Sequence, residues 1–429
     1  MRTDRARLAA LAAALALLAA PAAAQPAAES ARALTLREAV SEAVLRNPNR
    51  VRAGHEVTVA GFQRDAAEWG RFPTLSVDVA PRVGGSQTGN GAPTTVARLE
   101  QPLWAGGRID AQIDSARQLV SAAESAEGET RQRLAEQTAA AYIEWLAAAE
   151  RVDIANKAAE LFQGLVRYVR QREGQGFASS ADAAIASARL SFALAQLAEL
   201  RGALARAYAQ LTSLTLISAP FRGVPVSVPP YARRSVEDTE QAYLENSPLV
   251  AQRRAEAESA RAQALVRQGL MLPKLALRLE YLSGQGPAYG ASNESRAMVV
   301  LQFTPEPGLA SYSGFRAAES RVDAVLAQLQ ADENEVRLRA RTNWADYAAS
   351  RLQADELEPQ ARGLDMASAS YMRQFEAGRK SWLEVLNTHR ETVDAKLALS
   401  RARTTRDQSA LRLMVNTGTF WPWLNALPQ

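Results

Sequence analysis

The sequence has no cysteine, two histidines among 429 residues, and only 6% aromatic residues. The lack of cysteine excludes a disulfide framework and the cysteine-linked lipid anchor of some exported bacterial proteins. His55 and His389 lie far apart, so the chain has no pair of histidines at metal-ligand spacing. Phosphate-binding glycine loops and the Gly-x-Ser-x-Gly elbow of hydrolases are missing too. We therefore expect neither an enzyme nor a bound metal or cofactor.

Long apolar runs are rare, and the most obvious one lies at the N-terminus. Three arginines precede an apolar run from Leu8 to Ala20, and small residues follow it up to Ala24. This pattern predicts a secretory signal peptide over residues 1–24. Because the later sequence offers no apolar stretch of ~20 residues, we expect no membrane-spanning helix in the mature chain. Cleavage also leaves a net charge of about +2, which is too small to indicate a nucleic-acid partner.

The chain contains an internal duplication with an offset of about 200 residues. Thr35 to Glu38 and Ser235 to Asp238 are equivalent helix-capping patterns, and Pro48 matches Pro248. We expect a first repeat over residues 25–217, a proline-rich linker over 218–235, a second repeat over 236–417, and a short irregular tail over 418–429.

Each repeat switches from helical to strand-like patterning, after Pro73 and after Pro273. Apolar residues then occupy every second position, and a glycine-rich polar segment separates two such stretches. We expect β-hairpins at about residues 75–103 and 275–304. Long helical segments follow over about 109–217 and 312–416, each folded back at a glycine as an antiparallel coiled coil. The predicted fold class is therefore α+β, mainly α, with helical arms of roughly 100 Å.

The four expected strands have about the length of membrane-spanning β-strands, ~9 to 11 residues. Four strands alone cannot lie in lipid, because the edge amides of an open sheet lack hydrogen-bond partners there. Single-chain barrels need at least about eight strands, so these four are expected to close with strands from other copies. The alternative is an ordinary hairpin pair packed on a soluble coiled coil. Strand length, polar loops, repetition and the signal peptide favour the membrane.

Four motifs recur in a characteristic order: LTLREAVSEAVLRNP from Leu34, QPLWAGGRIDAQIDSA from Gln101, REGQGFASSAD from Arg172 and QFEAGRKSWLEVL from Gln374. With the duplication, their order and spacing resemble the TolC family of outer-membrane export channels over essentially the whole mature chain. The resemblance implies a homotrimer whose four strands per chain form a twelve-stranded barrel in outer-membrane lipid. Its helices would form a hollow α-barrel across the periplasm of a Gram-negative bacterium. A periplasmic adaptor protein and an inner-membrane pump, ABC-type or proton-driven, are the implied partners of this passive duct.

Two stretches, FTPEPGLASYSGFRAAESR from Phe303 and SYMRQFEAGRKSWLEVLN from Ser370, look most similar to the outer-membrane components of type I secretion systems that export adhesins. Protein export is therefore the expected function. Drug or metal-ion efflux is the alternative, because the scaffold is shared whatever the cargo. A less favoured alternative from another class is a soluble periplasmic coiled-coil scaffold.

The resemblance places the functional site at the two turns between the long and the returning helices, which form the periplasmic end of such channels. By matched positions, Asp182 and Lys380 are expected to hold the entrance closed. Glu384 and Asn387 match two acidic positions that ring the narrowest point, and Asn387 departs from that pattern. The alternative is an ordinary solvated turn, since exposed ion pairs contribute only ~0–1 kcal/mol. The other predicted site residues are Arg379 and Phe375 at the entrance, and Gly176, Phe177, Ser179, Gly378 and Trp382 at the turns.

Overall fold

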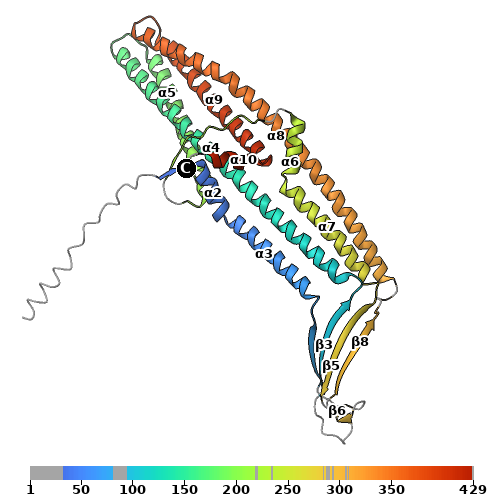
Figure 1. Ribbon diagram of the computed structural model, residues 1–429. Coiled ribbons are helices and arrows are strands. Elements are labelled where there is room, and N and C mark those ends of the chain that lie inside the picture. Colours follow the sequence, from blue (N-terminus) through green and yellow to red (C-terminus); the bar gives the residue numbers. More distant parts are fainter. Residues whose placement is uncertain are drawn as a thin grey trace, which may run out of the picture.

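The computed structural model is an elongated molecule, with two helical hairpin tips at one end and a four-stranded sheet at the other (Figure 1). It describes residues 32–80, 94–217, 221–232, 235–283, 285–286, 290–291, 294–304, 307 and 309–427. The predicted signal peptide, residues 1–24, lies outside this range, and so does most of the two polar hairpin loops. The mainly helical α+β class predicted from the sequence is confirmed.

The helices and strands occur in the same order twice along the chain. The first series is α2 (Leu36–Arg46), α3 (Pro48–Trp69), β2 (Thr74–Ala80), β3 (Thr94–Trp104), α4 (Arg108–Gly174) and α5 (Ser180–Thr215). The second series is α6 (Val236–Glu245), α7 (Pro248–Gly269), β5 (Lys274–Ser283), β8 (Glu294–Gln302), α8 (Ala310–Glu376) and α9 (Trp382–Asn416). Short strands β6 (Gln285–Gly286) and β7 (Gly290–Ala291) follow β5. Helices α4 and α8 have 67 residues each.

Small and apolar side chains at helical spacing pack each long helix against its returning partner. In the first hairpin, Ala155 and Phe162 of α4 share a buried cluster with Leu197 and Leu200 of α5. Helix α5 is the one described helix whose length and composition would allow a membrane crossing. Ala193, Leu197 and Leu200 of this helix lie in the buried cluster, and 28% of its apolar window is buried in the structure.

Two polar residues interrupt the apolar stripe of α8, and both meet helices of the same repeat. Arg254 of α7 donates to Glu333 over 3.0 Å. Asn343 donates to the hydroxyl of Tyr243 on α6 over 3.1 Å. The stripe is irregular because this part of α8 packs along α6 and α7 as well as along α9.

The largest core lies at the middle of the rod, where the linker and both ends of the described chain meet. Here β1 (Arg32–Leu34) pairs in parallel with β4 (Phe221–Gly223), a strand within the proline-rich linker. The fully buried Tyr142 of α4 joins these strands, because its hydroxyl donates to the Leu34 carbonyl over 2.7 Å and accepts from the Val224 amide over 2.9 Å. The same amide also donates to the same carbonyl over 3.2 Å, so the hydroxyl adds two bonds to an existing contact between the strand segments.

The C-terminal segment, expected to be irregular, forms helix α10 (Phe420–Ala426) instead. Phe420 and Leu424 lie one turn apart, and both are buried in the central core at 0% and 1% exposure. Pro422 lies in the first turn, where a helix needs no amide donor. The expectation was wrong because the helix depends on tertiary burial, which a short proline-containing segment does not reveal.

The four long strands form one antiparallel sheet in the order β2-β3-β5-β8. The central pair, β3 and β5, joins the hairpin of one repeat to that of the other. Strands β2 and β8 form the two edges, and each is hydrogen-bonded on one side only within the described chain.

Candidate channel surfaces at the two ends of the molecule

The two tip turns end their long helices in the same way. Gly176 and Gly378 have φ angles of 78° and 73°, a region that favours glycine. The amide of Phe177 donates to the carbonyl of Arg172, and the equivalent bond in the second turn has the same length of 2.8 Å. This is the Schellman arrangement, which satisfies the last carbonyls of a helix. The predicted turn glycines are therefore required by backbone geometry.

Each returning helix begins with a complete capping box. The carboxylate of Asp182 accepts from the Ser179 amide over 3.0 Å and from its hydroxyl over 2.8 Å, and the Asp182 amide donates back over 3.1 Å. Ser381 and Glu384 repeat the arrangement at the start of α9. The bonds from Ser179 hold the pKa of Asp182 below its usual value. These carboxylates have a local structural role in addition to any role at an entrance.

Lys380 is paired within its own turn. Its ammonium group lies 2.7 Å from a carboxylate oxygen of Glu384 and 4.5 Å from the centre of the Tyr371 ring. The Lys380 bond, followed by those from Ser381, lowers the pKa of Glu384 to about 2, so this carboxylate is ionised at neutral pH. Within one chain, Lys380 therefore meets Glu384 and not Asp182. A contact between Asp182 and Lys380 of different copies stays a prediction.

The other predicted tip residues divide into packed and exposed groups. Phe375 is half-buried with its ring 4.8 Å from that of Tyr168, and Trp382 is half-buried between the two hairpins. Phe177 is 72% exposed. Asn387 is half-buried on α9, whereas Arg379 is exposed at the turn. Among the predicted aromatic residues of the tip, Phe177 is therefore the exposed one and Trp382 is packed.

The sheet at the other end exposes its apolar face more than its charged face. On the central strand β5, Leu279 is 43% exposed, whereas the side chain of Glu280 retains only 13% exposure. A water-soluble sheet shows the opposite arrangement, with its apolar face covered. The exposed large apolar residues of the four strands are Leu75, Val77, Val79, Leu99, Leu103, Trp104, Leu277, Leu279, Tyr281, Val299 and Leu301.

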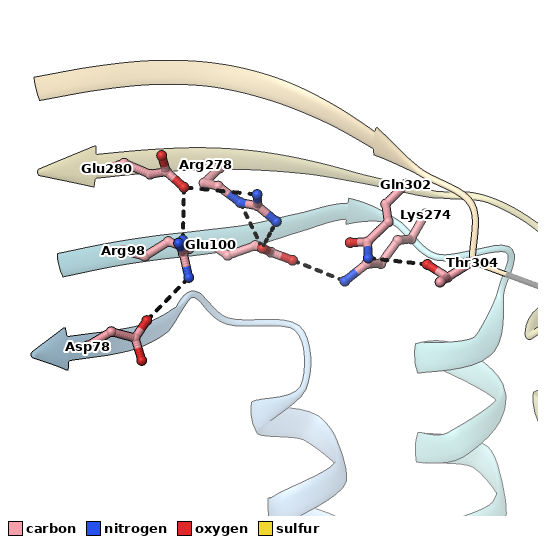
Figure 2. Close-up of polar contacts among 8 residues, drawn as sticks. All are labelled: Asp78, Arg98, Glu100, Lys274, Arg278, Glu280, Gln302 and Thr304. Carbon is pink, nitrogen blue, oxygen red and sulfur yellow. Dashed lines mark hydrogen bonds and ion pairs between the residues drawn. The ribbon is translucent and has the colours of Figure 1, made fainter. Parts of the chain in front are cut away.

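Figure 2 shows the polar contacts on the opposite face. Arg98 of β3 donates to Glu280 of β5 over 2.8 Å and contacts Asp78 of β2 at 3.4 Å. Arg278 and Lys274 of β5 both donate to Glu100 of β3, over 2.7 and 3.2 Å. We call these six residues the charged ladder: Asp78, Arg98, Glu100, Lys274, Arg278 and Glu280.

The charged ladder favours a single register between the two hairpins. Arg98 lies opposite Glu280, and Glu100 lies opposite Arg278. A slip of two residues, which keeps every side chain on its face, places either Arg98 opposite Arg278 or Glu100 opposite Glu280. Both slipped pairings oppose like charges, which is destabilising.

The alternation of apolar residues predicts the strands, whereas the charged ladder was not among the predicted sites. A signal was present, because β3 and β5 both contain the tripeptide Arg-Leu-Glu, at residues 98–100 and 278–280. Antiparallel pairing of two copies of this tripeptide places each arginine opposite the other glutamate. Recognising it required knowing that β3 is the neighbour of β5.

Comparisons with known proteins agree with this architecture. Residues 39–215 match the family described as outer membrane efflux protein. The cobalt-zinc-cadmium resistance protein CzcC of Cupriavidus metallidurans is 26% identical over 317 residues, which cover 71% of this chain and 72% of that protein. The outer-membrane channel OprN is 19% identical, with a TM-score of 0.77 over 90% of both chains. The outer membrane protein VceC from Vibrio cholerae is 17% identical, with a TM-score of 0.72 over 89% of this chain and 96% of that one.

The fold is that of the outer-membrane channels just described. The family match over residues 39–215 and the shared fold confirm the predicted similarity to TolC-like outer membrane efflux proteins. The chain is an outer-membrane efflux channel that extends into the periplasm, which sets aside the alternative of a soluble scaffold. Members of the family are passive ducts and not enzymes. The predicted TolC-like family is confirmed, whereas the assignment to type I secretion stays a prediction.

Charge reversal at the ladder should disturb assembly. Glu280→Arg places an arginine opposite Arg98, and we expect a cost of about 1 kcal/mol per chain and a several-fold loss of folded protein from the outer membrane. The reciprocal double variant Arg98→Glu/Glu280→Arg restores an opposite-charge pair and should recover most of the folded protein in the outer membrane. Quantitative blotting of outer-membrane fractions measures both. Equal yields of the single and the double variant would show that the pair does not set the register.

Proposed function

We propose that three copies of the chain close their sheets into one twelve-stranded barrel and act as the outer-membrane duct of a tripartite efflux system. The observation that carries this proposal is the sheet with an exposed apolar face, a charged opposite face and two unpaired edges. Lipid requires an apolar outer surface, and it tolerates no open edge. Water inside a barrel accommodates the charged face.

The strand directions are compatible with closure between copies. Neighbouring strands alternate in direction across the sheet, so β2 and β8 run in opposite directions. When copies stand side by side around an axis, β2 of one and β8 of the next therefore meet as an antiparallel pair. Four strands fall short of the smallest membrane barrels, and three copies supply twelve. Trimers are also the rule in this family, whose members work with periplasmic adaptors and inner-membrane pumps.

We propose small solutes, either drugs or metal ions, as the cargo. CzcC, named for resistance to cobalt, zinc and cadmium, aligns with most of this chain and supports this reading. Type I protein secretion, which the motifs near Phe303 and Ser370 predicted, is the second candidate. Both cargo classes need the same duct. The inner-membrane pump that delivers the cargo to the duct determines which class is exported.

We further propose that the tip turns form a gate at the periplasmic entrance and dock to the adaptor. Lys380 and Glu384 already form an ion pair within each chain. Lys380 retains two further donor positions, because an ammonium group has three. Asp182 of an adjacent copy is the proposed acceptor. Phe177, exposed beside its turn, is the proposed anchor for the adaptor.

Cross-linking tests closure between copies. The chain has no native cysteine, so Ser76→Cys on β2 and Val300→Cys on β8 introduce a unique pair at the two sheet edges. A bismaleimide should join these cysteines between copies and produce covalent dimers and trimers on a denaturing gel. The matched pair Val96→Cys/Leu282→Cys lies on facing positions of β3 and β5 and should produce cross-links only within one chain. Monomers alone from the edge pair would contradict the barrel.

Deletion of the gene in its host tests the cargo. We expect the minimal inhibitory concentrations of divalent metal ions or of cationic dyes to fall several-fold, because a duct is essential for a tripartite pump. The wild-type gene on a plasmid should restore them. The secreted proteins of the same strains are compared by mass spectrometry. Loss of one large secreted protein with unchanged resistance would transfer the assignment to type I secretion.

Single-channel recording tests the gate. Lys380→Gln and Asp182→Asn should each raise the conductance of the reconstituted trimer, and the double variant should conduct no more than either one, since both remove one contact. Lys396→Gln is the control, because it removes a lysine that pairs with Asp365 elsewhere on the hairpin. Additive effects of the two gate variants, or an unchanged conductance, would contradict a contact between these residues.

A further inference from the structure

All charged side chains of the four described long strands lie on one face of the sheet. Along each strand, the charged residues occur only at every second position. The exposed leucines and valines occupy the positions between them and therefore lie on the other face of the sheet. Beyond the charged ladder, this face carries two further charges on β8, which pair with each other at 3.7 Å. The complete set is Asp78, Glu100, Glu280 and Glu294 with Arg98, Lys274, Arg278 and Arg296. Four carboxylates thus balance four cations.

Ion pairs also bring these opposite charges close together. Separations range from 2.7 Å between Arg278 and Glu100 to 4.0 Å between Arg278 and Glu280. A paired charge has a much weaker field at a distance than an isolated charge, because the two potentials cancel. The face therefore presents polar groups to water without a net potential of either sign.

Resting on the proposed trimeric barrel, we infer that this face lines a charge-compensated lumen, and that the barrel admits anionic, cationic and zwitterionic solutes alike. Twelve strands spaced about 4.8 Å apart and tilted about 40° enclose a barrel with a backbone radius of about 12 Å. The Debye length at 0.1 M salt is about 10 Å. An uncompensated ring of three charges on the wall would therefore be felt across much of the lumen.

Glu100 is the residue on which the balance chiefly depends. It accepts from Arg278 and from Lys274, so one carboxylate compensates two cationic neighbours. Its side chain is only 25% exposed, and both of its oxygens are engaged. Replacing it with glutamine adds one positive charge per chain, or three per barrel. Arg98 has the opposite role, since it lies between Asp78 and Glu280.

Reversal potentials of reconstituted trimers in a potassium chloride gradient test the inference. Glu100→Gln should lower the ratio of potassium to chloride permeability on the order of threefold, the size expected for three screened charges on the wall. Glu280→Gln adds the same charge and should shift the ratio in the same direction. Arg98→Gln should raise the ratio. The double variant Arg98→Gln/Glu100→Gln has no net change in charge and should return it to the wild-type value.

The outcomes separate the two proposals. Opposite shifts for the carboxylate and arginine variants, cancelled in the double variant, support a lumen held neutral by its ion pairs. Shifts of the same sign, or unchanged ratios through conducting pores, overturn this inference and leave the duct intact. If wild-type protein forms no conducting pore, the proposed duct fails and the inference fails with it.

Discussion

Backbone hydrogen bonding in lipid is the constraint on which the rest of this structure depends. Strands β2 and β8 each have one edge without a neighbouring strand among the described residues, and the sheet exposes an apolar face that suits a membrane. Hydrocarbon supplies no partner for the amides and carbonyls of such edges. The proposed barrel would supply these partners from neighbouring copies, and the antiparallel strand order is compatible with such closure.

The charged face of the sheet has two effects, one on the strand register and one on the net charge of that face. Its charged ladder joins a strand of each repeat, so the same contacts that fix the register also neutralise the face. Either function alone would explain a few ion pairs. Their combination explains why Arg-Leu-Glu occurs twice on adjacent antiparallel strands, since this tripeptide is complementary to itself only in that orientation.

At the opposite end, local backbone chemistry dominates. A glycine with positive φ ends each long helix, and a serine with a carboxylate three residues later begins each returning helix. Since these bonds are made within each turn, the hairpins need no neighbour to close. Two side chains of these turns remain available for further contacts. Lys380 has donor positions beyond its bond to Glu384, and Phe177 is largely exposed.

The sequence by itself determined what depends on neighbours along the chain. Capping residues, turn glycines, the period of the strands and the duplication are local patterns, and they predicted the helices, both hairpins and the family. Only the tertiary structure decided which strands are neighbours, and with that the pairs Arg98–Glu280 and Glu100–Arg278. It also decided that Lys380 meets Glu384, and that Phe420 and Leu424 make the tail a helix. The physical reason is that such contacts join residues whose separation in sequence carries no periodic signal.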